Sequence, residues 1–156
     1  MTIVEFLEAR LAEDEAVARE AITPDRPGTH WEWESTADDD DPESPRWLRT
    51  VEEFPTTSGV GDLPGFPLGY DCKAEPSPAM DHIARHDPAR ILREIAAKRS
   101  VIGKYLWADR VREQMEEDDD DVKWEWIFKS EALVEVLRAL SCIYSDHPDY
   151  QKEWAL

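Results

Sequence analysis

Two histidines four positions apart, His82 and His86, are the residues of this sequence whose type and spacing best suit chemistry. In a helix over residues 79–86, both imidazoles would lie on one face, just before Pro88 interrupts the helix. Neutral imidazoles at this spacing can share a zinc ion with ligands from elsewhere in the chain, so zinc is the cofactor to consider. The further candidate ligands, which match no known ligand spacing, are Cys72, Asp87, Cys142, His147 and Asp149.

The two histidines also have other interpretations. One can hydrogen-bond the bend at Asp87 while the other is exposed, or the pair can contact a partner. His86-Asp87 invites comparison with metal phosphohydrolases that use a helix-borne His-Asp dyad, but His30 falls in an expected strand instead of an upstream helix. The sequence also lacks a Gly-x-Ser-x-Gly elbow and a phosphate loop. A protein without catalytic activity is therefore favoured, and a metal-binding protein or metal-dependent hydrolase centred on His82 and His86 is the alternative.

The first half of the chain predicts one helix followed by short strands. Residues 3–21 repeat apolar side chains near the helical period, with Thr2 as the N-cap. Trp31 and Trp33 alternate with polar residues, which predicts a strand with both indoles on one face. Further strands are expected near residues 47–54 and 66–70, so a small antiparallel sheet is predicted.

The second half predicts helices. After the helix at 79–86, Asp87 is a natural N-cap and Pro88 suits the first position of a long helix that runs to about Met115. A last helix over 122–144 would pack on it as an antiparallel hairpin. We therefore expect a single α+β domain over residues 1–156, with a small antiparallel sheet packed on an N-terminal helix and a C-terminal antiparallel helical hairpin.

Charge is the strongest compositional signal. The chain carries 36 acidic and 18 basic residues, a formal net charge of −18, which opposes direct binding to nucleic acid or to an anionic membrane surface. Two aspartate runs, 38–41 and 118–121, fall in expected acidic loops at about 35–45 and 118–121. The simplest interpretation is a solvated surface, but capture of a basic protein partner and imitation of a nucleic-acid backbone are also open.

Tryptophan is abundant, with seven residues in the chain. Trp124 and Trp126 closely follow the second aspartate run, which would place an aromatic anchor beside an acidic rim. The alternative is that Trp126 belongs to the core and Trp124 shields a loop. The predicted partner-binding residues are Asp118, Asp119, Asp120, Asp121 and Trp124.

The compartment follows from what the sequence lacks. The start of the chain has no basic and apolar leader, and no segment approaches the ~20 apolar residues of a membrane span. Cys72 and Cys142 show no paired spacing, which fits free thiols in a reducing cytoplasm. We expect a cytoplasmic protein, which the family resemblance described next would place in a bacterial host cell, and the sequence leaves its oligomeric state open.

A motif adds family context. Two segments carry it: the first is His82-Ile83-Ala84-Arg85-His86-Asp87-Pro88, continued to Arg99, and the second is Tyr144-Ser145-Asp146-His147-Pro148-Asp149-Tyr150. In these segments the chain resembles an uncharacterised family of small acidic proteins from actinobacteria and their phages. The middle segment 35–78 is longer than the corresponding region of that family. The resemblance implies an accessory or phage-encoded cytoplasmic protein and transfers no activity. Together with the charge, it predicts a non-enzymatic acidic interaction protein of phage or mobile-element context that binds a basic protein partner.

Overall fold

The computed structural model describes residues 1–22, 28–35, 46–51, 67–71, 78–114 and 120–156. The chain forms two compact units, and two of its helices contribute to both. The first unit contains Met1–Asp14 and Glu94–Leu156, and the second contains Glu15–Arg93. Among the described residues helices dominate: α1 (Ile3–Glu20), α2 (Pro78–Arg85), α3 (Pro88–Gln114) and α4 (Asp120–Ser141).

Helix α1 begins where the sequence predicts. The Glu5 amide donates a hydrogen bond to the Thr2 hydroxyl (3.2 Å), and the Thr2 amide donates one to the Glu5 carboxylate (2.7 Å). This reciprocal capping box satisfies amides that the first helical turn leaves without partners. The contact with Thr2 also lowers the pKa of the Glu5 carboxyl. The predicted N-cap at Thr2 is therefore confirmed, and Glu5 completes it.

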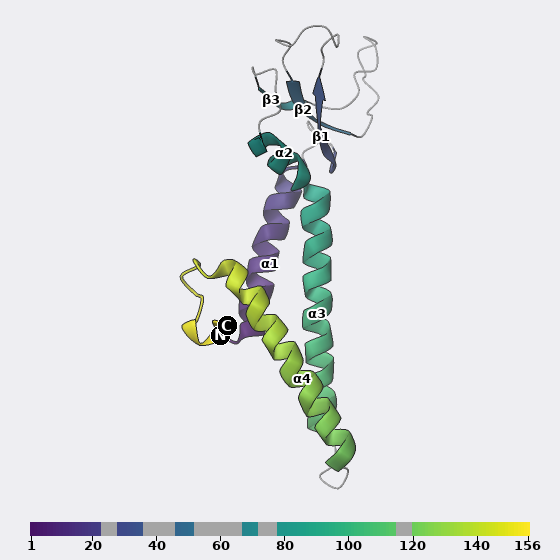
Figure 1. Cartoon of the computed structure of the whole chain (residues 1–156), viewed down its shortest axis with the longest axis vertical. Coiled ribbons are helices and arrows are strands. Elements are labelled where there is room, and N and C mark those ends of the chain that lie inside the picture. The colour runs from purple at the N-terminus through teal and green to yellow at the C-terminus, as the bar shows by residue number, and fades with distance from the viewer. Residues whose placement is uncertain (23–27, 36–45, 52–66, 72–77, 115–119) are drawn as a thin grey trace. The chain divides into compact units, whose positions relative to one another are not determined.

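The first unit is built on a helical core. Figure 1 shows the first turns of α1 beside α3 and α4, and a 3.4 Å ion pair between Glu8 and Arg99 joins α1 to α3. Buried side chains of these three helices form the core of this unit: Phe6, Leu7, Leu11, Ile95, Ile102, Ala108 and Leu137. Leu7 and Leu11 are four residues apart, and Ile95 and Ile102 are seven apart, which is the spacing of one face of an amphipathic helix.

Helices α3 and α4 form the predicted C-terminal helical pair. The Trp107 and Trp126 rings meet edge to face at 4.8 Å, and the Ser130 hydroxyl donates a 3.4 Å hydrogen bond to Asp109. Leu106 would continue an apolar stripe through Ile95 and Ile102 by its spacing, but it is exposed, whereas Ala108 is buried.

The C-terminal segment folds back on α1. It contains two 3-10 turns, η1 (Cys142–Tyr144) and η2 (Lys152–Trp154). The Phe6 ring contacts four aromatic side chains from this segment, at centroid separations between 5.0 and 6.3 Å, and Trp154 is buried. These four are Tyr144, His147, Tyr150 and Trp154. Trp154 thus packs against the Phe6 ring, whereas Leu156 is exposed.

The second unit holds three short strands, β1 (Trp31–Ser35), β2 (Arg46–Thr50) and β3 (Pro67–Asp71). They pair antiparallel in the order β1-β2-β3, with Trp33 opposite Leu48, and the pairing of β2 with β3 shifts register after Leu48. Each strand has only five residues, so the strand content is small. Packing of a sheet against the first helix and the hairpin stays a prediction, since the strands and the hairpin belong to different units.

The bend between α2 and α3 forms as predicted. Asp87 is buried, and its carboxylate accepts a 2.6 Å hydrogen bond from the Arg90 amide, while Pro88 begins α3. This is the N-cap arrangement, in which proline takes a position whose amide has no helical partner. The Ala89 amide donates a 3.0 Å hydrogen bond to the Thr29 carbonyl, which joins the start of α3 to the segment before β1.

Candidate functional site

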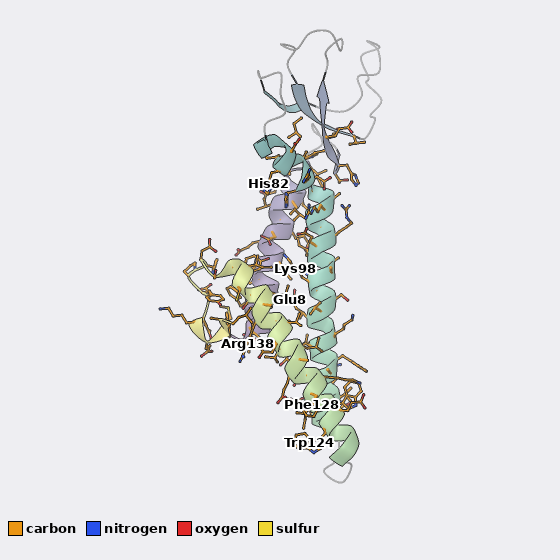
Figure 2. The ribbon with its side chains drawn as sticks, viewed as in Figure 1. Glu8, His82, Lys98, Trp124, Phe128 and Arg138 are labelled. Atoms are coloured by element: carbon orange, nitrogen blue, oxygen red, sulfur yellow. The ribbon has the colours of Figure 1, made fainter. Side chains whose placement is uncertain are left out.

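The end of the α3–α4 hairpin exposes large aromatic side chains. Trp107 on α3 is 57% exposed, and Trp124 and Phe128 on α4 are 57% and 64% exposed. Trp124 and Phe128 are four residues apart, so they lie one turn from each other on the same helix face, with ring centroids 6.1 Å apart (Figure 2). We call Trp124 and Phe128 the aromatic surface.

Trp126 joins α4 to α3. Its ring is partly buried, the Trp107 ring packs on its edge, and the Lys129 ammonium lies 4.2 Å from its centroid. Lys129 in turn forms a 2.5 Å ion pair with Glu125. The alternative interpretation of the two tryptophans is therefore half correct: Trp126 supports the helical pair, and Trp124 is exposed.

The other predicted partner-binding residues are only partly placed. Asp118 and Asp119 lie outside the described residues, and Asp120 and Asp121 form the first positions of α4. Sequence reasoning missed Phe128, although its four-residue spacing from Trp124 could have identified it. Trp107 is exposed on α3, where its ring meets that of Trp126.

A cleft of about 620 Å³ runs between α3 and α4 beside the aromatic surface. Tyr105 and Phe128 supply its aromatic lining, and two ion pairs supply charge, Arg112 with Asp109 (2.6 Å) and Arg138 with Glu135 (2.9 Å). Partial burial and the neighbouring Asp109 carboxylate raise the pKa of Tyr105, so its hydroxyl stays neutral at physiological pH. The cleft therefore offers both apolar and charged contacts.

The two histidines meet as their spacing predicts. The His82 and His86 rings are 4.1 Å apart between centroids and tilted by 38°, and His82 lies on α2 (Figure 2). His86 Nδ1 lies 2.8 Å from the His82 carbonyl oxygen. A carbonyl can only accept, so Nδ1 carries the hydrogen, and Nε2 is the ring nitrogen available for a ligand.

These rings open into a pocket of about 400 Å³ that we call the histidine pocket. Its lining is Asp81, His82, Arg85, His86 and Arg90. Among the described residues, three or more His, Cys, Asp or Glu side chains do not gather as a metal would require. Of the further ligand candidates, Cys72 lies outside the described residues, Asp87 caps α3, and His147 contacts Arg10. The zinc site stays a prediction.

A third cluster of ionisable groups surrounds Arg10, which is 7% exposed. Its guanidinium donates to His147 Nδ1 (2.6 Å) and to Glu13 (2.7 Å), and lies 5.5 Å from the Phe6 centroid. The Asp149 amide also lies 3.1 Å from His147 Nδ1, so the ring contacts both Arg10 and the backbone of Asp149. Arg10 Nε is buried and has no partner among the described atoms. The cluster holds the C-terminal segment on α1, which is a structural role.

Comparison with known proteins places the chain in a family. The model described as Family of unknown function (DUF6221) matches residues 1–156. The chain belongs to this family. The match covers both units, the aromatic surface and the histidine pocket, and the expectation of an uncharacterised family is confirmed. No curated protein and no solved structure gives a significant match to this DUF6221 chain.

In the segments of this DUF6221 protein that the structure describes, each helix is too short or too polar to cross a bilayer.

Proposed function

We propose that this protein is a non-enzymatic interaction protein that binds a basic protein partner through the end of its α3–α4 hairpin. The observation that carries the proposal is the aromatic surface, where Trp124 and Phe128 are both more than half exposed on one face of α4. Exposed aromatic side chains that cluster on a rigid helical pair are the usual anchors of protein interfaces.

The negative charge of the chain supports a basic protein as the partner. Six consecutive acidic residues, 116–121, precede Trp124 by three positions, and the whole chain has a net charge of −18. A partner with a basic rim around an apolar pocket would gain both aromatic burial and charge complementarity here. The same charge repels phosphate backbones, which favours a protein over a nucleic acid.

The cellular setting is part of the proposal. The resemblance of the His82–Pro88 motif to small acidic proteins of actinobacteria and their phages supports a phage or mobile-element origin and action in the host cytoplasm. The partner would then be a basic host or phage protein.

A matched pair of variants tests the proposal. W124A/F128A removes two exposed aromatic side chains from the hairpin, and I143A/L156A removes two exposed apolar side chains elsewhere in the same unit. A partner would be captured from an actinobacterial lysate with the wild-type chain, purified, and titrated against all three proteins. We expect a basic partner whose affinity falls more than about tenfold for W124A/F128A alone and weakens with added salt.

Two results would contradict the proposal. One is an equal affinity for W124A/F128A and I143A/L156A, which would place the interface elsewhere. The other is a wild-type dimer that W124A/F128A dissociates in sedimentation velocity, because the aromatic surface would then bind a second copy of this chain and would not be free for a basic partner.

A further inference from the structure

The histidine pocket differs in charge from the rest of this acidic protein. Two guanidinium groups, Arg85 and Arg90, and two imidazoles line it, against the single carboxylate of Asp81. We propose that this pocket binds the phosphate group of a small phosphorylated molecule. The site lies in the second unit and is independent of the aromatic surface.

The neighbouring carboxylate of Asp87 does not neutralise the pocket. Asp87 is buried, is absent from the pocket lining, and accepts the Arg90 amide at 2.6 Å as the cap of α3. Its negative charge is therefore used at the positive end of the helix dipole. The formal charge of the lining residues is then +1 with both histidines neutral, and it rises when either imidazole takes a proton.

The donors of the pocket are held in position by backbone contacts. Arg90 Nη1 donates a 3.2 Å hydrogen bond to the Arg85 carbonyl, which directs that guanidinium along the pocket side of the α2–α3 bend. His86 donates its Nδ1 hydrogen to the His82 carbonyl, so Nε2 is the nitrogen available, and it donates to a phosphate oxygen only in the imidazolium form. Arg85 and His82 are exposed and can turn toward a ligand. Guanidinium and imidazolium groups are the side chains that bind phosphate oxygens most strongly.

The same residues are unfavourable for a metal cation. Two permanently charged guanidiniums line the space that the metal would occupy, and they repel a divalent ion. The described residues also supply fewer than three ligand groups around one point. An anion has the opposite sign and meets donors on several sides. The charge of the lining therefore decides between zinc and phosphate in favour of phosphate.

The size and setting of the pocket indicate a small molecule. A volume of about 400 Å³ falls in the range of roughly 300–1,000 Å³ that small-molecule sites occupy. A nucleic acid would bring many further phosphates against a chain of net charge −18, at a large electrostatic cost. A single phosphomonoester meets only the local positive charge.

The test uses the full chain and inorganic phosphate as the probe. The histidine side-chain NMR signals would be followed during a phosphate titration at constant ionic strength, with chloride as the reference anion. We expect saturable shifts of the His82 and His86 signals while those of His30 and His147 stay in place. R85A should weaken phosphate binding about tenfold. R93A, which removes the same charge from an exposed site outside the pocket, should leave it unchanged.

Each alternative gives a distinct result. Equal weakening by R85A and R93A, or shifts that chloride reproduces, would overturn the proposal. Zinc that shifts the His82 and His86 signals when phosphate does not would show a metal site. A short single-stranded oligonucleotide that binds more tightly than phosphate and loses affinity equally in R85A and R93A would show a nucleic-acid surface. Circular dichroism of both variants would verify that each remains folded.

Discussion

The Tyr144 hydroxyl donates a 2.6 Å hydrogen bond to the Asp14 carboxylate, which joins residues 130 positions apart in the sequence. Tyr144 also packs its ring edge on Phe6 and lies 5.8 Å below the Lys98 ammonium, so three separate parts of the chain meet at one side chain. Figure 2 shows Lys98, whose ammonium lies over the Tyr144 ring, on α3. The C-terminal segment is thus tied to α1 by a polar contact as well as by aromatic packing.

This contact predicts a loss of stability in alkaline solution. Burial first, and then the hydrogen bond to Asp14, raise the pKa of Tyr144 above its ordinary value of 10.0. Above that pH the unfolded chain releases the tyrosine proton while the folded chain retains it, so the folded state becomes less favoured as pH rises. The contribution is fully present below pH 10.0 and is lost above it. Urea unfolding at neutral pH and above pH 10.0 measures the change.

The Y144F variant is the control for this effect. It lacks the ionisable proton, so its stability should decline less steeply above pH 10.0 than that of the wild type. At neutral pH it should be less stable by about 1 kcal/mol because the Asp14 hydrogen bond is lost. Identical alkaline slopes for both proteins would mean that Tyr144 ionises as easily in the folded state as in the unfolded one.

Arg10 is predicted to hold the C-terminal segment in place. R10M keeps a long apolar side chain over Phe6 but removes the hydrogen bonds to His147 and Glu13. The loss should be about 1–3 kcal/mol, since the partially buried His147 acceptor loses its charged donor. Hydrogen exchange should become faster over residues 142–154 and stay unchanged in α2. R19M removes an exposed arginine of the same helix, so it should neither lower the stability nor speed hydrogen exchange over residues 142–154.

Leu137 tests the core of the first unit. It is fully buried on α4, so L137A should leave a cavity and lower the free energy of unfolding by about 2–5 kcal/mol. The adjacent Val136 is exposed, and V136A should change stability by less than about 0.5 kcal/mol. Chemical denaturation of the two variants compares neighbouring positions on the same helix. A similar loss of unfolding free energy in L137A and V136A would show that Leu137 is not more deeply buried than Val136.

Asp87 tests the bend that carries the histidine pocket. D87A removes the cap that accepts the Arg90 amide, and should cost about 1 kcal/mol and speed hydrogen exchange in the first turn of α3. D81A removes an exposed carboxylate of the same pocket and should leave that exchange unchanged. Unchanged exchange of the Arg90 amide in D87A would show that the cap does not stabilise the start of α3.

Local patterns predicted much of the secondary structure. The cap at Thr2, the bend at Asp87-Pro88, the bounds of the long helices and the antiparallel pairing of the strands all follow from interactions between neighbours in sequence or from the alternation of side chains. The contact of the His82 and His86 rings also follows, because four residues make about one helical turn. Such features depend on only a few adjacent residues, which is why a single sequence is enough to predict them.

Individual positions on the helices were harder to predict. Leu106 fits an apolar stripe on α3 but is exposed, while Ala108 is buried, and of the alternatives Val17 and Ala18 it is Ala18 that is buried. Helical periodicity defines a face only approximately, and the packing partner decides which side chain fits against it. The contact of Trp107 with Trp126 likewise depends on the packing of α3 and α4.

The sequence by itself determined the acidic character of this protein, its predominantly helical segments and the pairing of the two histidines, because charge, periodicity and capping are properties of the chain or of single turns. Only the tertiary structure decided that Arg10 meets His147, 137 positions away, and that Trp124 and Phe128 are left exposed. It also decided that two arginines line the pocket of the histidines. Contacts between distant residues depend on how all the helices pack together, and no local pattern encodes that packing.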